Sequence, residues 1–145
     1  MFSHILILPL ISGLTAQIIK FFIKSNHTKF SIKNIVAYSG MPSGHSAIII
    51  SLATIIGLEE GFSSSLFAVS VVMAIIVIRD ALGIRRYLGE HGKTLNILVK
   101  DLGNDNVLEA KYPHLLEHIG HTPLQVFIGS LMGLIISVIG YILLN

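Results

Sequence analysis

The sequence contains no cysteine, and only 12% of its 145 residues are charged. Without cysteine, the chain can form neither disulfide bonds nor thiolate metal sites. An average soluble domain carries about 25% charged residues, whereas 52% of this chain is hydrophobic. The sequence also lacks low-complexity tracts, internal repeats and nucleic-acid motifs. Composition and length therefore indicate one membrane domain, residues 1–145, without a nucleic-acid partner.

Four apolar segments predict an all-α membrane helix bundle with about four transmembrane segments. The first, third and fourth cover residues 2–23, 64–82 and 124–144. The second, residues 47–58, reaches about 17 residues with the preceding turn at Pro42, which is short for a complete span. We expect its start to be recessed into the protein, where irregular backbone is shielded from lipid. The first run lacks a basic n-region and an Ala-x-Ala site, so we expect no cleaved signal peptide.

The polar stretch between the third and fourth segments, residues 83–121, contains a helical pattern. Apolar residues recur there at i, i+3, i+4 and i+7, namely Leu95, Leu98, Val99 and Leu102. This pattern predicts an amphipathic helix that lies along the membrane surface or over a site.

Basic residues are distributed very unevenly along the chain. With four spans, residues 24–40 and 83–120 share one side of the membrane, and all ten Lys and Arg residues lie on that side or at its boundary. The opposite side carries Glu59 and Glu60 but no basic residue. By the positive-inside rule, we expect these two loops in the cytoplasm and both termini outside.

The motif Met41-Pro42-Ser43-Gly44-His45-Ser46 opens the second apolar segment. Proline fixes φ, serine can cap a helix, and glycine allows the backbone to approach a ligand closely. A helix N-terminus presents unpaired N–H groups and the positive end of a dipole, which suits a phosphate. A histidine in the first turn would stand beside the bound anion as a proton donor. The motif therefore predicts a phosphoryl-transfer site.

The expected topology brings further ionisable residues to the same membrane face. They lie at the ends of the other three segments: Lys20 (first), Arg79, Asp80 and Arg85 (third) and His121 (fourth). Ionisable residues in or beside a span are costly to desolvate and are therefore functional candidates. From position alone, Lys20 could instead snorkel to the interface, and the arginines could be anchors or topogenic charges.

Two motifs resemble signatures of the type 2 phosphatidic acid phosphatase (PAP2) superfamily. Pro42-Ser43-Gly44-His45 looks like its second signature. His121-Thr122-Pro123-Leu124-Gln125-Val126 is similar to the third, and Gly129 and Gly133 follow at a spacing that permits close helix packing. With Arg-Asp-Ala-Leu-Gly-Ile-Arg-Arg between them, nearly the whole chain resembles the divergent PAP2 branch of small bacterial membrane proteins. The resemblance implies a place in the bacterial cytoplasmic membrane, and the distribution of basic residues described above leads us to expect the site on the cytoplasmic side.

This resemblance also implies a phosphatase that uses a phosphohistidine intermediate and neither metal nor cofactor. His121 would attack phosphorus, and His45 would protonate the leaving oxygen. Lys20 would hold phosphate oxygens, and Ser43 and Gly44 would contribute donors at the helix start. The implied substrate is a lipid phosphate or another phosphomonoester, in contact with membrane lipids.

The chain departs from the family pattern at two positions of the third signature. Leu115 stands where the family has an Arg, and Gln125 stands where it has the Asp that orients the nucleophile. An amide accepts a hydrogen bond from a histidine N–H but stabilises imidazolium less than a carboxylate does. Arg79 or Arg85, together with Asp80, could supply the missing groups from the third segment.

Other interpretations remain open at this point. His91 lies six residues after Arg85, which is the Arg-to-His spacing of the third signature, but no proline and apolar helix follow it. The chain could also be a non-enzymatic lipid-phosphate-binding or transport component that has lost turnover, or a small assembly subunit. Convergence of Lys20, His45 and His121 within reach of one phosphate would favour the enzyme.

Overall fold

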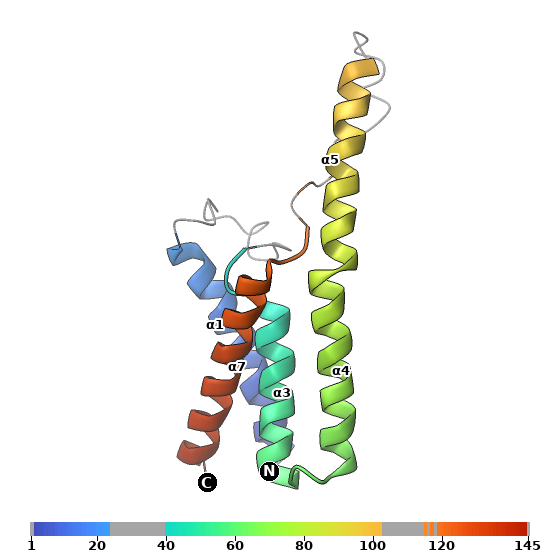
Figure 1. Cartoon of the computed structure of the whole chain (residues 1–145). Coiled ribbons are helices and arrows are strands. Elements are labelled where there is room, and N and C mark those ends of the chain that lie inside the picture. Colours follow the sequence, from blue (N-terminus) through green and yellow to red (C-terminus); the bar gives the residue numbers. More distant parts are fainter. Residues whose placement is uncertain (1, 24–39, 103–114, 116, 118, 145) are drawn as a thin grey trace.

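The computed structural model describes residues 2–23, 40–102, 115, 117 and 119–144. Within these residues all regular structure is helical: α1 (Phe2–Phe22), α3 (Gly44–Glu60), α4 (Ser65–Leu82), α5 (Ile84–Leu102) and α7 (Pro123–Leu144). Figure 1 shows α1, α3, α4 and α7 as an up-and-down bundle with both termini at its lower end. The predicted all-α membrane fold is confirmed.

Three stretches of the described chain are long and apolar enough to cross a membrane: His4–Phe22, Ser65–Asp101 and Pro123–Leu144. The remaining bundle helix, α3, has 17 residues. At a rise of 1.5 Å per residue it is about 26 Å long, slightly less than a hydrocarbon core of about 30 Å. The short second segment expected from the sequence is therefore present as α3.

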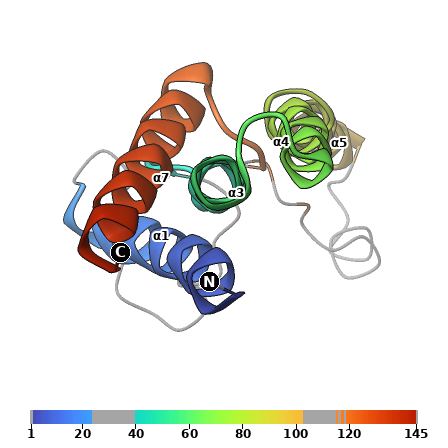
Figure 2. The same cartoon turned by 90° about the horizontal axis from the view of Figure 1, so that it is seen from below.

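Helix α3 is the centre of the bundle. It packs against α1, α4 and α7, and the view along the bundle shows it between α4 on one side and α1 and α7 on the other (Figure 2). Its contact with α7 includes a buried hydrogen bond of 2.6 Å between the hydroxyls of Ser51 and Ser137. The start of α3 consequently lies at the centre of the bundle, with Ser43, Gly44 and Ser46 buried.

Glycines bring α7 directly against the backbone of α3. A Cβ atom at Gly129 would lie 2.3 Å from the carbonyl oxygen of Ser43, and one at Gly133 would lie 2.2 Å from that of Ala47. Small residues let helix backbones approach closely where lipid provides no hydrophobic drive for association. The close packing predicted from the Gly129-x-x-x-Gly133 spacing is therefore observed, and it determines how near α7 comes to the start of α3.

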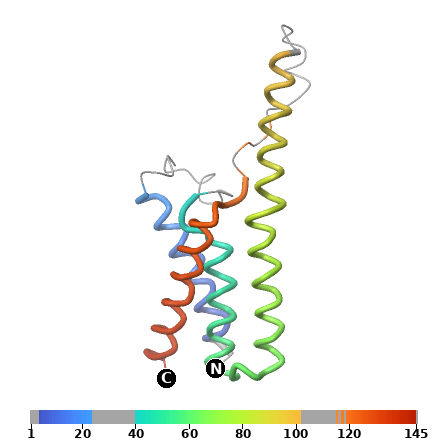
Figure 3. Tube along the Cα trace, viewed as in Figure 1, coloured from blue at the N-terminus to red at the C-terminus, as the bar shows by residue number. Residues whose placement is uncertain are grey.

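Helix α5 continues the direction of α4 beyond the end of the bundle (Figures 1 and 3). Gly83 separates the two helices, but its N–H donates to the carbonyl of Arg79 at 2.9 Å, and its carbonyl accepts from the N–H of Tyr87 at 3.1 Å. The backbone hydrogen bonds thus continue across Gly83, which explains why α5 continues in the direction of α4. The predicted amphipathic helix is α5, and it begins at Ile84, well before the pattern that predicted it. Its expected position along the membrane surface or over a site was wrong, because α5 projects beyond the bundle in the direction of α4 (Figure 1).

The backbone before α7 runs back along α5 and α4. The side chain of Asn96 pairs with the backbone of Leu115 through two hydrogen bonds, each 2.9 Å long. Gly120 has a φ of 93°, a conformation that glycine adopts without steric cost. The N–H of His121 then donates to the carbonyl of Ala81 at 3.1 Å. These contacts hold His121 at the end of α4, beside the start of α3.

Candidate functional site

The ring of His121 is held by Gln125. His121 is buried, with 4% of its surface exposed, and its Nδ1 lies 3.3 Å from Oε1 of Gln125. The same oxygen accepts a hydrogen bond of 3.0 Å from the N–H of Thr122. Because a backbone N–H can only donate, the amide must present its oxygen here, so Nδ1 of His121 carries the proton. The other ring nitrogen, Nε2, therefore keeps its lone pair.

Gln125 is itself fixed by the first turn of α7. Its N–H donates to Oγ1 of Thr122 at 3.3 Å, while its own Oε1 accepts from the N–H of Thr122. This reciprocal pairing is a capping box, with the sequence signature Thr-x-x-Gln. One amide oxygen thus stabilises the start of α7 and sets the tautomer of His121.

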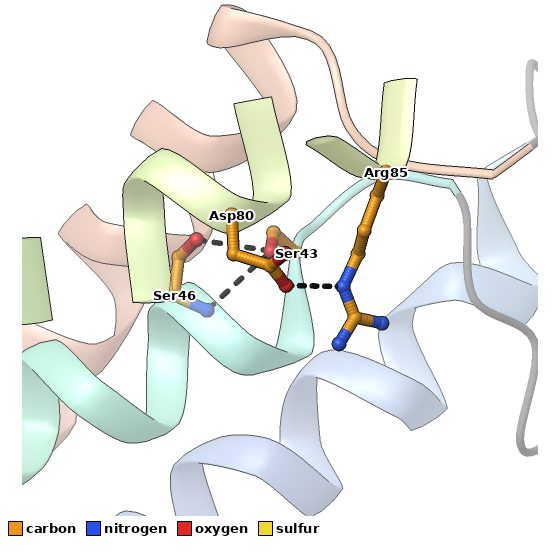
Figure 4. Close-up of polar contacts among 4 residues, drawn as sticks. All are labelled: Ser43, Ser46, Asp80 and Arg85. Carbon is orange, nitrogen blue, oxygen red and sulfur yellow. Dashed lines mark hydrogen bonds and ion pairs between the residues drawn. The ribbon is translucent and has the colours of Figure 1, made fainter. Parts of the chain in front are cut away.

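Ser43 caps α3 and joins it to α7. Its Oγ accepts from the N–H of Ser46 at 3.4 Å and from the Ser46 hydroxyl at 3.0 Å (Figure 4). Its N–H donates to the carbonyl of Gln125 at 3.0 Å. The Ser43 N–H is therefore occupied by α7. Donors for an anion at this helix start are instead the amides of Gly44 and His45, for which the helix offers no acceptor.

An ion pair lies beside the first turn of α3. Nε of Arg85, at the start of α5, donates to Oδ2 of Asp80 near the end of α4 (Figure 4). Both charges, and that of Lys20, are close enough to act on the ring of His45. Lys20 lies in the last turn of α1 and is 3% exposed, whereas His45 is exposed. Helices α1, α3, α4 and α5 thus contribute ionisable groups to one place.

Lys20, His45 and Arg85 also act on His121. Burial, followed by the positive charge of Lys20, lowers the pKa of His121 to about 4, with further lowering by His45 and Arg85 and partial opposition from the Gln125 hydrogen bond. His121 is therefore neutral near pH 7, and its Nε2 keeps its lone pair. Lys20, His45 and Arg85 thus all influence the charge state of His121.

Three positions considered from the sequence lie outside this cluster. Arg79 is exposed in the last turn of α4, and His91 is exposed on α5. Leu115, at the position of the family Arg, is bonded to Asn96, which lies about 16 Å along α5 from Arg85 at 1.5 Å per residue. Among the described residues that end or follow the third apolar segment, the cation near His121 is therefore Arg85.

No metal site is found in the part of the chain that the structure describes. Within it, no group of three or more His, Asp or Glu side chains is arranged to hold a metal ion. The site is instead built from donors and cations, which suit an oxyanion.

Gln17 also lies at the start of α3, although the sequence analysis did not single it out. A Cβ atom at Gly44 would lie 3.4 Å from Nε2 of Gln17, so the amide packs against the first residue of α3. Gln17 precedes Lys20 by three residues, which places both on one face of α1. That spacing is the signal in the sequence that could have identified it.

Comparison with known proteins decides the family. The model of the divergent PAP2 family matches residues 1–136. This chain belongs to the divergent PAP2 family. It is also 40% identical over 148 residues to the uncharacterized membrane protein YuiD of Bacillus subtilis (strain 168), with 90% of this chain and 92% of YuiD covered. No solved structure matches the chain significantly. The divergent PAP2 resemblance is confirmed, and the apolar helices and the relative together indicate a membrane protein.

Proposed function

We propose that this divergent PAP2 protein is a metal-independent phosphatase that acts on a lipid phosphate or another phosphomonoester through a phosphohistidine at His121. The observation that carries the proposal is the hydrogen bond from His121 Nδ1 to Gln125, which leaves Nε2 unprotonated. Around it stand Lys20, Arg85 and His45, the groups that a transferring phosphoryl group requires. Positioning and charge stabilisation supply most of the catalysis in such reactions.

The first step forms a bond between Nε2 of His121 and phosphorus while the bond from phosphorus to the leaving oxygen breaks. His45, as imidazolium, gives its proton to that oxygen. Lys20, Arg85 and the first amides of α3 offset the charge on the non-bridging oxygens. Asp80 keeps the Arg85 side chain in place through their ion pair.

The second step releases phosphate. A water molecule attacks phosphorus, and the bond between phosphorus and Nε2 breaks. His45, now neutral, takes a proton from the water and returns to its starting state. His121 regains its lone pair, so atoms and charges balance over the cycle.

The test is phosphate release from a panel of lipid phosphates and small phosphomonoesters by the purified full chain. General-acid help is worth about 10² to 10⁴ in rate, so His45→Ala should slow release by that order. The loss should shrink for leaving groups that need no proton. Release by the wild type that does not depend on His45 would refute this role.

A non-enzymatic lipid-phosphate binder or transport component is a second candidate. It is favoured by Gln125, because a neutral amide at the position of the family Asp stabilises an imidazolium-like intermediate less than a carboxylate would. A protein of this kind would bind inorganic phosphate but release none from any substrate of the panel. Binding without turnover in both wild type and His45→Ala would therefore favour the binder.

We also propose that the site faces the cytoplasm. The site lies at the end of the bundle opposite both termini (Figure 1). In the topology expected from the sequence, the basic residues lie on this side of the membrane. In the cysteine-free chain, Glu60→Cys should react with an impermeant thiol reagent in intact cells, and Lys93→Cys only after permeabilisation. The reverse pattern would show the opposite orientation.

A further inference from the structure

The side chain of Gln17 carries an unexplained polar atom. Among the described residues, its Oε1 is buried and has no hydrogen-bond partner in the protein. A buried acceptor without a donor is unfavourable and calls for an explanation. The other end of the amide, Nε2, packs beside Gly44 at the start of α3. The amide of Gln17 therefore packs beside the start of α3, where the phosphate site is proposed, and its oxygen is unpaired.

Apart from Asp80, which pairs with Arg85, and the neutral His121, the other groups assigned to the site favour negative charge. Lys20 and Arg85 are cations, and the start of α3 presents N–H groups and the positive end of the helix dipole. These groups attract an anion, but an anion made only of acceptor oxygens cannot pair the oxygen of Gln17. A phosphoryl group near neutral pH is different, because one of its oxygens still carries a proton for part of the time.

We propose that Oε1 of Gln17 accepts a hydrogen bond from the protonated oxygen of the bound phosphoryl group. Gln17 is then a specificity-determining residue that selects protonated phosphate over fully deprotonated oxyanions such as sulfate. Sites built to hydrogen-bond a ligand proton reject analogues that lack it, because a buried polar atom is left unpaired. This inference rests on the proposed phosphate site and adds to it a residue and a criterion of selection.

The test compares binding of inorganic phosphate and inorganic sulfate to the purified full chain by calorimetry at about pH 6, where phosphate is protonated. The wild type should bind phosphate at least about ten-fold more tightly than sulfate. Gln17→Met has similar length but no acceptor, so it should bind the two anions within about three-fold of each other.

Two further variants distinguish ligand recognition from a structural role. Gln17→Glu keeps an acceptor and adds a negative charge, so it should weaken sulfate binding more than phosphate binding. Thr15→Val is the control, because position 15 lies about 200° around α1 from position 17, and it should leave the wild-type preference unchanged. Thermal unfolding provides a second measurement, since removing an unpaired buried oxygen in Gln17→Met should not lower stability in the absence of anion.

The outcomes separate this inference from the proposed function. A wild type that binds phosphate, with a preference that Gln17→Met and Gln17→Glu leave unchanged, overturns the role of Gln17 alone. A wild type that binds sulfate as tightly as phosphate also overturns it. A wild type that binds neither anion overturns the proposed phosphate site together with this inference.

Discussion

Oε1 of Gln125 lies 3.3 Å from Nδ1 of His121 and also accepts from the N–H of Thr122. In the proposed mechanism, the amide performs the orienting part of the role that the resemblance gives to an Asp, since it sets which ring nitrogen carries the proton. It does not contribute the negative charge that would stabilise a positively charged phosphohistidine. Orientation and charge stabilisation are thus separated in this chain.

Substitution of Gln125 tests this separation. Gln125→Glu keeps the side-chain length and both hydrogen bonds and adds the charge, so we expect phosphate release to be unchanged or faster. Gln125→Leu removes both bonds, and because leaving the ring N–H of the buried His121 without its acceptor costs about 1–3 kcal/mol, release should fall by roughly ten-fold or more. Steady-state rates of the two variants, with thermal unfolding to check the fold, give the comparison. Equal loss in both variants would contradict the orienting role.

The two arginines near Gly83 provide a matched pair. Arg85 acts on His121 and is bonded to Asp80, whereas Arg79 is exposed and does not appear among the charges that act on His121. Arg85→Ala should therefore weaken phosphate binding by about ten-fold or more, the usual scale for a charged hydrogen bond. Arg79→Ala should change it by less than about two-fold, as surface charges usually do. Dissociation constants for inorganic phosphate measure both effects, and a larger loss in Arg79→Ala would reverse the assignment.

The pKa of His121 makes stability depend on pH. The folded pKa of about 4 lies below the ordinary histidine value of 6.5. Between these values the unfolded chain binds a proton that the folded chain does not, so stability falls as pH falls from about 6.5 towards 4. Above that range neither state is protonated at His121, and its contribution is constant.

The measurement is thermal unfolding in detergent from about pH 7 to pH 4. His121→Asn does not titrate, so the wild type should lose stability relative to this variant as the pH falls. A difference between the two proteins that is independent of pH would show that the His121 pKa is not lowered by folding.

Much of the fold was predictable because membrane helices are encoded by length and hydropathy. The apolar segments anticipated α1, α3, α4 and α7, and the Gly129 and Gly133 spacing anticipated close packing of α7, although not that its partner is α3. The direction of α5 was not predictable, since it depends on hydrogen bonds that pass through Gly83. A glycine between two helical patterns is equally compatible with a sharp turn.

The candidate site was predictable in its membership but less so in its detail. His45, His121 and Lys20 followed from motifs and from their common membrane face. Whether Arg79 or Arg85 accompanies these residues depends on where the chain directs each side chain on either side of Gly83. Sequence spacing does not determine that direction. The hydrogen bond from the Ser43 N–H to the carbonyl of Gln125 joins residues 82 positions apart, so it could be found only in the structure.

The central claim is that Nε2 of His121 is the nucleophile, and trapping the phosphorylated enzyme tests it most directly. The purified chain is mixed with substrate, quenched, and examined by mass spectrometry and ³¹P NMR to locate the phosphoryl group. We predict phosphate on Nε2 of His121, accumulation in His45→Ala given a leaving group that needs no proton, and none in His121→Ala. Phosphate on His91, or full turnover by His121→Ala, would contradict the account.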